Sequence, residues 1–110
     1  MEIDWRLYVK EGDAKIFGKG PKSLLLKIDE TGSIRKAAAA MHLSYTKAWN
    51  MIENLEKGLG IQVLEKQIGG KYGGGSYLTE EAKGFIENYE AFEQEAGEAI
   101  AKIFQSRFGS

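Results

Sequence analysis

The sequence GSIRKAAAAMHLSYTKAWNMIENLEKGL, residues 32–59, predicts two helices joined by a tight turn. Ser33 is a favourable N-cap, and the alanine-rich residues 34–41 that follow form helix readily. The apolar spacing of this first helix is interrupted at His42, and Ser44 can cap a second helix over residues 44–58. The other elements of the chain can be placed around this helix pair.

The second helix has one apolar face and one face of varied polar groups. Its apolar stripe consists of Ala48, Met51, Ile52 and Leu55. At 100° per residue, Thr46 and Asn50 lie opposite that stripe. They are flanked by Lys47, Trp49 and Glu53. Such a face can bind base edges and phosphates, as the second helix of a helix-turn-helix does in the major groove. Helix pairs with short turns are also common elsewhere, so the pattern alone leaves both interpretations open.

Length and composition indicate one soluble domain. The 110 residues are 43% hydrophobic and 28% charged. The absence of cysteine excludes disulfides, thiolate zinc sites and cysteine nucleophiles. No apolar run is long enough to span a bilayer, and the N-terminus lacks a signal-peptide profile, so we expect a cytoplasmic protein without a membrane partner. With a single histidine and no clustered metal ligands, we expect no enzyme and no cofactor.

The charge is unevenly distributed. The formal net charge is −1, but residues 1–78 hold 12 Lys and Arg against 9 Asp and Glu. Residues 79–110 hold 3 against 7. Because local potential matters more than the sum, the basic excess of the first part permits DNA binding without requiring it.

Residues 4–17 predict an N-terminal β-hairpin. Trp5 to Val9 alternate apolar and polar, residues 11–13 resemble a turn, and residues 15–17 resume a strand. A helix then follows from Pro21 to about residue 30, in which Asp29 and Glu30 are expected to be solvated charges.

Residues 62–78 predict a wing, that is, two strands joined by a glycine-rich loop. The loop GGKYGGGS covers residues 69–76 and carries Lys71, which could reach a phosphate or the minor groove. A nucleotide-binding loop would need its lysine after the second glycine cluster, and Lys71 precedes it. A plain hairpin loop without function remains the alternative.

Residues 79–108 predict one long helix, capped by Thr79, with a heptad seam. A small core cannot cover both ends of a helix of about 40 Å, so we expect its distal half to form a homodimer. The alternative is that the helix folds back over its own domain. The expected dimerisation residues are Phe85, Tyr89, Phe92, Ala96, Ala99, Ile100, Ile103 and Phe104.

Three segments together resemble the N-terminal DNA-binding domain of ModE-type transcriptional regulators, and more distantly the winged helix of LysR-type regulators. They are GSIRKAAAAMHLSYTKAW at 32–49, GGKYGGGSYLT at 69–79, and the aromatic-bearing helix that follows. Residues 17–20, FGKG, resemble the lead-in to the first helix of that family. The resemblance implies an α+β fold, a winged helix-turn-helix with an N-terminal β-hairpin and a long C-terminal dimerisation helix.

Carried over position by position, the resemblance also implies site residues. The DNA-contacting face would consist of Ser44, Tyr45, Thr46, Lys47, Trp49 and Asn50. Lys71 would act from the wing, and Arg35 and Lys36 would be either phosphate contacts or solvated charges. Ser44 could be only a cap, and Tyr45 and Trp49 lie on the flank of the helix, where packing is an equal possibility.

The expected organisation is a DNA-binding domain over residues 1–78 and a dimerisation helix over residues 79–108. Two recognition helices related by a two-fold axis predict a pseudo-palindromic site on double-stranded DNA. Molybdate-responsive members continue into oxyanion-binding domains that residues 79–110 cannot form. We therefore expect no molybdate sensing from this chain, and either constitutive binding or control by an unknown effector or partner protein.

A different class of function stays open on sequence grounds. The near-neutral charge, with Trp49 and Tyr72 as exposed aromatic residues, also suits a winged-helix module that binds proteins and not DNA.

Overall fold

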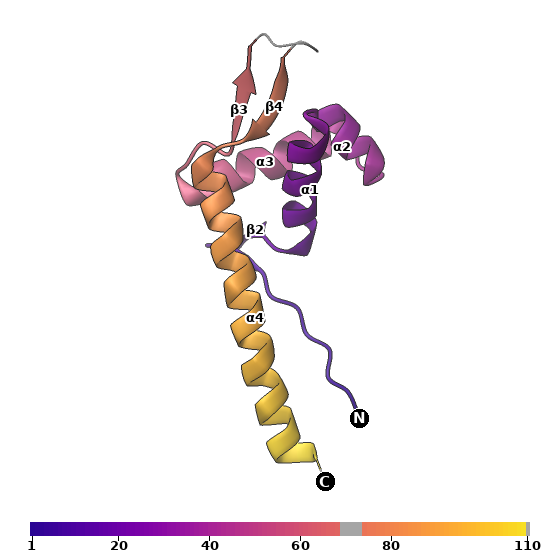
Figure 1. Ribbon diagram of the computed structural model, residues 1–110, viewed down its shortest axis with the longest axis vertical. Helices are drawn as coiled ribbons and strands as arrows, with labels where there is room; N and C mark the ends of the chain where they lie inside the picture. Colours follow the sequence, from indigo (N-terminus) through magenta and orange to yellow (C-terminus); the bar gives the residue numbers. More distant parts are fainter. Residues whose placement is uncertain (69–73, 110) are drawn as a thin grey trace.

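A computed structural model describes residues 1–68 and 74–109 of the chain (Figure 1). The elements are β1 (Val9–Glu11), β2 (Ala14–Phe17), α1 (Lys19–Thr31), α2 (Ile34–Ala40), α3 (Tyr45–Leu59), β3 (Leu64–Gln67), β4 (Gly75–Leu78) and α4 (Glu80–Phe108). The strands form two separate antiparallel pairs, β1 with β2 and β3 with β4. This is the predicted α+β fold, a helix-turn-helix followed by a wing and a long C-terminal helix.

The three predicted N-caps, Ser33, Ser44 and Thr79, all cap their helices. The Oγ atoms of Ser33 and Ser44 accept the backbone N–H groups of Lys36 and Lys47, each at 3.0 Å. Thr79 caps α4 in the same way, through the N–H of Ala82 at 3.1 Å. A cap of this kind contributes about 1 kcal/mol, so the start of each helix is fixed locally by its sequence.

One hydrophobic core lies where α1, α2, α3 and the beginning of α4 meet. The ring of Phe17 packs edge-to-face against Phe85 and Tyr89, with centroids 4.9 Å apart in both pairs. The buried hydrophobic residues are Ile16, Phe17, Leu24, Leu25, Ile28, Ala37, Ala38, Ala48, Ile52, Leu55, Val63, Leu78, Ala82, Ile86 and Tyr89. The first three turns of α4 are thus part of the core and not a separate unit.

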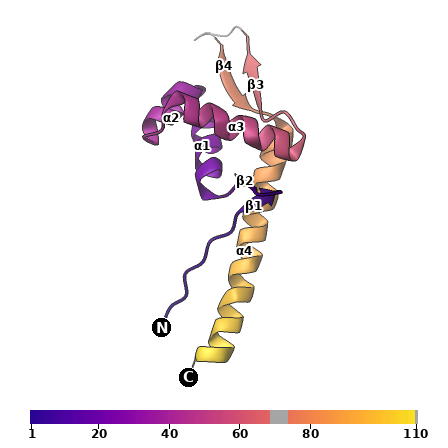
Figure 2. The same cartoon turned by 180° about the vertical axis from the view of Figure 1, so that it is seen from behind.

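The N-terminal hairpin is shorter than the predicted 4–17. Pairing is confined to β1 and β2, and residues 4–8 run in an extended line beside α4 (Figures 1 and 2). Tyr89 donates its hydroxyl hydrogen to the carbonyl oxygen of Leu7 at 2.7 Å, and Trp5 lies against Gly97. In an extended segment every second side chain points the same way, whether or not the segment pairs with a strand. The alternation of residues 4–8 therefore places apolar side chains against α4 and not in a sheet.

Helix α4 projects well beyond the helix-turn-helix, which gives the molecule extents of 60 × 30 × 26 Å (Figure 1). Apart from residues 1–8, its distal half has no neighbouring element in either view (Figures 1 and 2). Across the described residues, no helix is both long enough and apolar enough to cross a membrane.

Candidate nucleic-acid interface

The predicted contact face of α3 is open to solvent. All six residues expected there, Ser44, Tyr45, Thr46, Lys47, Trp49 and Asn50, are exposed. Ala48, Ile52 and Leu55 are buried against the rest of the core. The amphipathic division of the helix is therefore as the spacing predicts, and its N-terminal half presents a hydroxyl, an ammonium and an amide to the outside.

Tyr45 and Trp49 form a stacked pair on the flank of α3. Their rings are 6.4 Å apart between centroids and inclined by 20°. The guanidinium of Arg35, from α2, lies 4.7 Å from the centre of the Tyr45 ring. With 41% and 45% of their surfaces exposed, neither aromatic side chain is part of the buried core. The structure thus adds Arg35, from another helix, to the two aromatic residues expected on the flank of α3.

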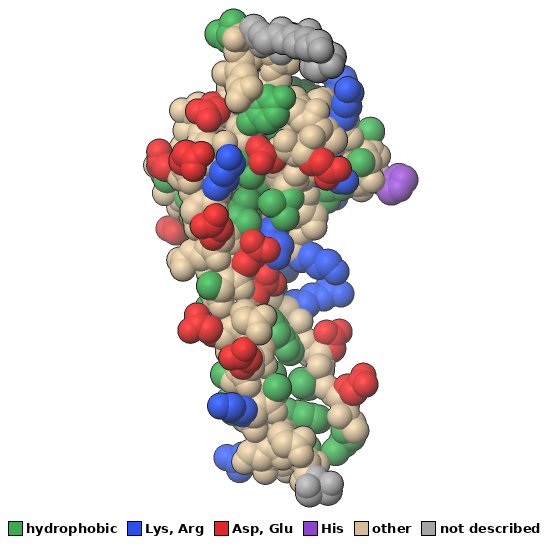
Figure 3. Space-filling view, viewed as in Figure 1, with side chains coloured by type: hydrophobic (Ala, Val, Ile, Leu, Met, Phe, Trp, Pro, Cys, Tyr) green, Lys and Arg blue, Asp and Glu red, His purple; other side chains and the backbone are tan. Residues whose placement is uncertain are grey.

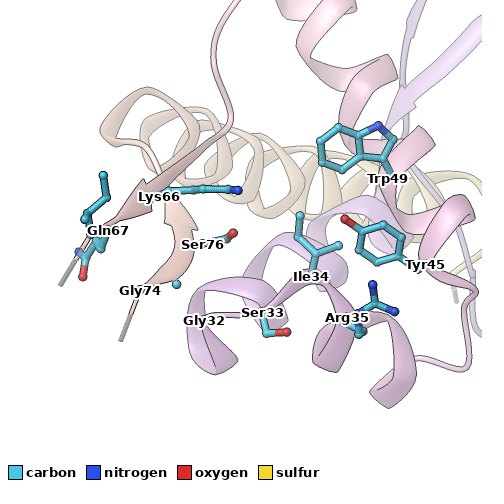
Figure 4. Close-up of a pocket in the computed structure, with 12 residues that line it drawn as sticks. Gly32, Ser33, Ile34, Arg35, Tyr45, Trp49, Lys66, Gln67, Gly74 and Ser76 are labelled. Carbon is cyan, nitrogen blue, oxygen red and sulfur yellow. The ribbon is translucent and has the colours of Figure 1, made fainter. Parts of the chain in front are cut away.

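An open groove of about 640 Å³ separates α3 and the start of α2 from the wing (Figure 4). Arg35, Tyr45 and Trp49 line one wall, and Lys66 and Gln67 of β3 line the other. Figure 4 shows the side chain of Lys66 extending from the wing into this space, toward the aromatic pair. Lys66 could not be predicted as a groove residue from the sequence, because the register of β3 against β4 decides which way its side chain points.

The wing is anchored to the helices at its base. The N–H of Ser76 donates to the carbonyl oxygen of Gly32 at 2.9 Å, and the N–H of Leu78 donates to Asp29 Oδ1 at 3.0 Å. Gly32 ends α1 at φ +72°, and an added Cβ would lie 2.8 Å from the Tyr77 hydroxyl. Asp29, expected to be a solvated charge, instead holds β4. The width of the groove is set by these contacts.

Of the 14 lysine and arginine side chains among the described residues, four form ion pairs and ten do not. Lys22, Lys27, Lys57 and Lys83 form ion pairs with glutamates. Within residues 1–68 and 74–109 no ion pair is found for Arg35, Lys36, Lys47 or Lys66, all of which are exposed. Figure 3 shows acidic side chains along much of α4 and also at the level of the helix-turn-helix. Lys71, predicted to act from the wing, lies outside the described residues.

Only part of the expected dimer seam is available to a second subunit. Tyr89 is buried and Phe85 half-buried, both against Phe17, so these two positions of the heptad already have partners in their own chain. Phe92 and Ile103 are 51% and 63% exposed. Ala99 is also exposed, and Ala96, Ile100 and Phe104 are partly covered.

Two groups at the junction of α1 and α4 have displaced pKa values. A hydrogen bond to Glu93 raises the pKa of Lys22, and burial raises the pKa of the Tyr89 hydroxyl. Both shifts favour the protonated side chains that join the N-terminal half of α1 and residues 1–8 to α4. They belong to the scaffold and lie away from the α3 face.

The exposed α3, its short turn from α2 and the strand pair that follows define a winged helix-turn-helix protein. The chain belongs to the lysR family of bacterial regulatory helix-turn-helix proteins, whose family profile matches residues 23–83. That stretch is more than half of the chain and contains most of α1, all of α2 and α3, the wing and the beginning of α4.

Several named relatives share this region. The chain is 38% identical to the transcriptional regulator ModE of Haemophilus influenzae over 71 residues, which are 64% of this chain and 28% of that protein. It is 39% identical to the molybdenum-pterin-binding protein MopB of Rhodobacter capsulatus over 84 residues, 76% of this chain and 30% of that protein. It is 35% identical to the DNA-binding transcriptional dual regulator ModE of Escherichia coli K12 over 72 residues, which are 66% of this chain and 28% of that protein.

The chain spans less than a third of the length of these relatives. The resemblance to ModE-type regulators is confirmed for the helix-turn-helix region that they share. The family is described as one of bacterial regulatory helix-turn-helix proteins, and the two ModE relatives are named as regulators of transcription.

Proposed function

We propose that the chain is a sequence-specific DNA-binding regulator of transcription, with α3 lying in the major groove. The observation that carries this proposal is the exposed N-terminal half of α3, where Thr46, Lys47 and Asn50 face solvent. These side chains need no role in folding, since their helix is held by Ser44 and by its buried stripe. Membership of the regulatory family supports the same conclusion.

Each side chain can be given a role from its chemistry. The amide of Asn50 can bind an adenine through two hydrogen bonds, and Lys47 can bind a guanine or a phosphate. Arg35 and Lys36, exposed at the start of α2, would bind phosphates. On sequence grounds alone, the 69–76 loop with Lys71 would contact the backbone or the minor groove.

The proposed functional unit is a homodimer, in which residues 1–78 bind DNA and residues 79–108 form the helix that pairs. The exposed Phe92, Ala99 and Ile103 lie on one side of α4 and continue the predicted heptad beyond the core. Two copies related by a two-fold axis would bind half-sites one or more helical turns apart, on a pseudo-palindromic operator.

DNA recognition is tested by selecting duplexes from a random pool and measuring affinity by fluorescence anisotropy at two salt concentrations. Asn50→Ala is expected to lose about 1–3 kcal/mol on the selected site and to relax the preference at one base position. Asn88→Ala, the same change at an exposed position of α4, is the matched control. An equal loss for Asn50→Ala on scrambled DNA would contradict base reading by this residue.

The homodimer is tested by sedimentation of two charge variants. Ile103→Glu places a carboxylate in the proposed interface and is expected to weaken self-association at least roughly tenfold. Gln105→Glu adds the same charge on another side of α4 and should change nothing. A protein that sediments as a monomer without any substitution would refute the dimer.

A second function is favoured by one observation, the 45% exposure of Trp49 in a chain of net charge −1. A winged-helix module that binds another protein would use this side chain and would bind no DNA. Absence of binding to any duplex by the folded protein at low salt would support this module over the DNA-binding regulator.

A further inference from the structure

With α3 in the major groove, one sugar–phosphate strand of the duplex lies in the groove between α3 and the wing. We propose that Arg35 and Lys66 each bind a phosphate of this strand from opposite walls, and that the Tyr45–Trp49 pair packs against its deoxyribose. This inference rests on the proposed DNA binding and goes beyond it, because it adds Lys66 to the interface and removes Tyr45 and Trp49 from base reading.

The lining of the groove matches the chemistry of a DNA strand. Its charged side chains are Arg35 and Lys66, and no carboxylate is found among its described lining residues. Between the two cations lie the apolar faces of Ile34, Tyr45 and Trp49 (Figure 4). A nucleic-acid strand alternates anionic phosphates with C–H-rich sugars, so both parts of the lining meet a suitable group.

The stacking of Arg35 prepares it for a phosphate. Its guanidinium lies over the Tyr45 ring, with Cζ 4.7 Å from the ring centre, and this contact restrains the group without using its N–H donors in an ion pair. Among the described residues no carboxylate pairs with it. A planar donor that is oriented in advance loses less conformational freedom on binding than a mobile lysine does.

The position of the aromatic pair favours sugar over base. At 100° per residue, Trp49 lies roughly 80° around the helix from the direction midway between Thr46 and Asn50, toward the wing. Bases of an intact duplex are stacked on one another, so a side chain on this flank meets the edge of the backbone first. A second hollow that is also lined by Trp49 and Lys66 contains the carboxylates of Glu56 and Glu65, which disfavour a phosphate there. The DNA strand is therefore expected on the side of Trp49 that faces Arg35.

The test compares Lys66→Gln, Arg35→Gln and Trp49→Ala in the full chain, on a selected duplex and on scrambled DNA. All three positions are exposed, and unchanged helicity by circular dichroism confirms the fold. Each cation variant is expected to lower the slope of log K against log salt by about one unit, with the ratio of specific to scrambled affinity unchanged. Trp49→Ala is expected to weaken both duplexes by about threefold to tenfold without changing the slope. Lys102→Gln, a matched charge change on distal α4, should alter neither quantity.

A second measurement locates the phosphate. Methylphosphonates, which are neutral, are introduced one at a time along the selected duplex. The inference expects one position whose cost is lost in Lys66→Gln but kept in Lys102→Gln. Unchanged salt slopes for the Arg35 and Lys66 variants would overturn the inference while the wild-type protein still binds DNA. So would a Trp49→Ala variant that loses its preference for thymine over deoxyuridine, because the indole would then read a base. A wild-type protein that binds no duplex would overturn the proposed function itself.

Discussion

Two glycines of α4 provide a matched test of how residues 4–8 are held. Glycine in the interior of a helix costs about 1 kcal/mol relative to alanine, so either Gly84→Ala or Gly97→Ala would stabilise an isolated helix. A Cβ added at Gly84 meets nothing within 4 Å, whereas at Gly97 it lies 2.8 Å from Cζ2 of Trp5. The two substitutions therefore differ only in whether a neighbouring side chain must move.

The magnitudes follow from that difference. Gly84→Ala is expected to raise the free energy of unfolding by about 1 kcal/mol, or the melting temperature by roughly 4 °C. At Gly97 the methyl group must displace the half-buried indole of Trp5. An indole that covers roughly 100 Å² contributes on the order of 2 kcal/mol, so the net effect of Gly97→Ala is neutral to destabilising. In a Trp5→Ala background the clash is gone, and Gly97→Ala should regain its stabilisation of about 1 kcal/mol.

The assay is thermal unfolding followed by circular dichroism at one protein concentration, together with tryptophan emission in a Trp49→Phe background, where Trp5 is the remaining indole. Release of Trp5 by Gly97→Ala should shift that emission to longer wavelength. Equal stabilisation by Gly84→Ala and Gly97→Ala, with unchanged emission, would refute the packing of residues 4–8 on α4.

Three further outcomes are expected, each measured by urea unfolding. Ser44→Ala removes the N-cap of α3 and should lower the free energy of unfolding by about 1 kcal/mol; an unchanged value would mean that the cap is dispensable. Asp29→Ala leaves the N–H of Leu78 without its acceptor and should cost about 1–3 kcal/mol, whereas Glu30→Ala, its exposed neighbour, should cost little. The raised pKa of Tyr89 means that the unfolded chain loses this proton first, near the ordinary value of 10.0, so stability should fall above about pH 10. Tyr89→Phe should fall less steeply there, and an equal fall would contradict the shift.

The helix-turn-helix could be predicted because its signals are local. Ser33, Ser44 and Thr79 each cap the helix that directly follows them, and the apolar stripe of α3 is set by helical periodicity. The exposed face opposite that stripe follows from the same periodicity. No knowledge of distant contacts is needed for any of these features.

The features that the sequence analysis missed all depend on contacts between distant segments. The alternation of residues 4–8 fits a strand, but these residues pack on α4, some 80 or more positions away. Asp29 resembles a solvated carboxylate until β4 brings the N–H of Leu78 to it. Tyr89 fits the dimer heptad equally well, and only the position of Phe17 shows that the ring is used within its own chain. In each case the periodicity and the residue type are compatible with the structure. The contacting segment could not be deduced from them, because it lies far away in the sequence.

The division of charge decides how a duplex can approach. Seven of the 16 acidic residues lie within residues 79–110, and their side chains gather over α4 (Figure 3). Ten Lys and Arg side chains of the described residues have no ion pair. Arg35, Lys36, Lys47 and Lys66 come from α2, α3 and the wing. The others are Arg6, Lys10, Lys15 and Lys19 near the N-terminus and Lys102 and Arg107 near the end of α4. Residues 79–110 are net negative even with Lys83, Lys102 and Arg107 counted, so a polyanion would be attracted to the α3 end of the molecule and repelled by α4 as a whole. Because exposed charges act over about 8 Å at physiological salt, this separation outweighs a net charge of −1. In the proposed DNA complex, the same acidic helix that lowers the overall charge would therefore help to orient the duplex toward α3.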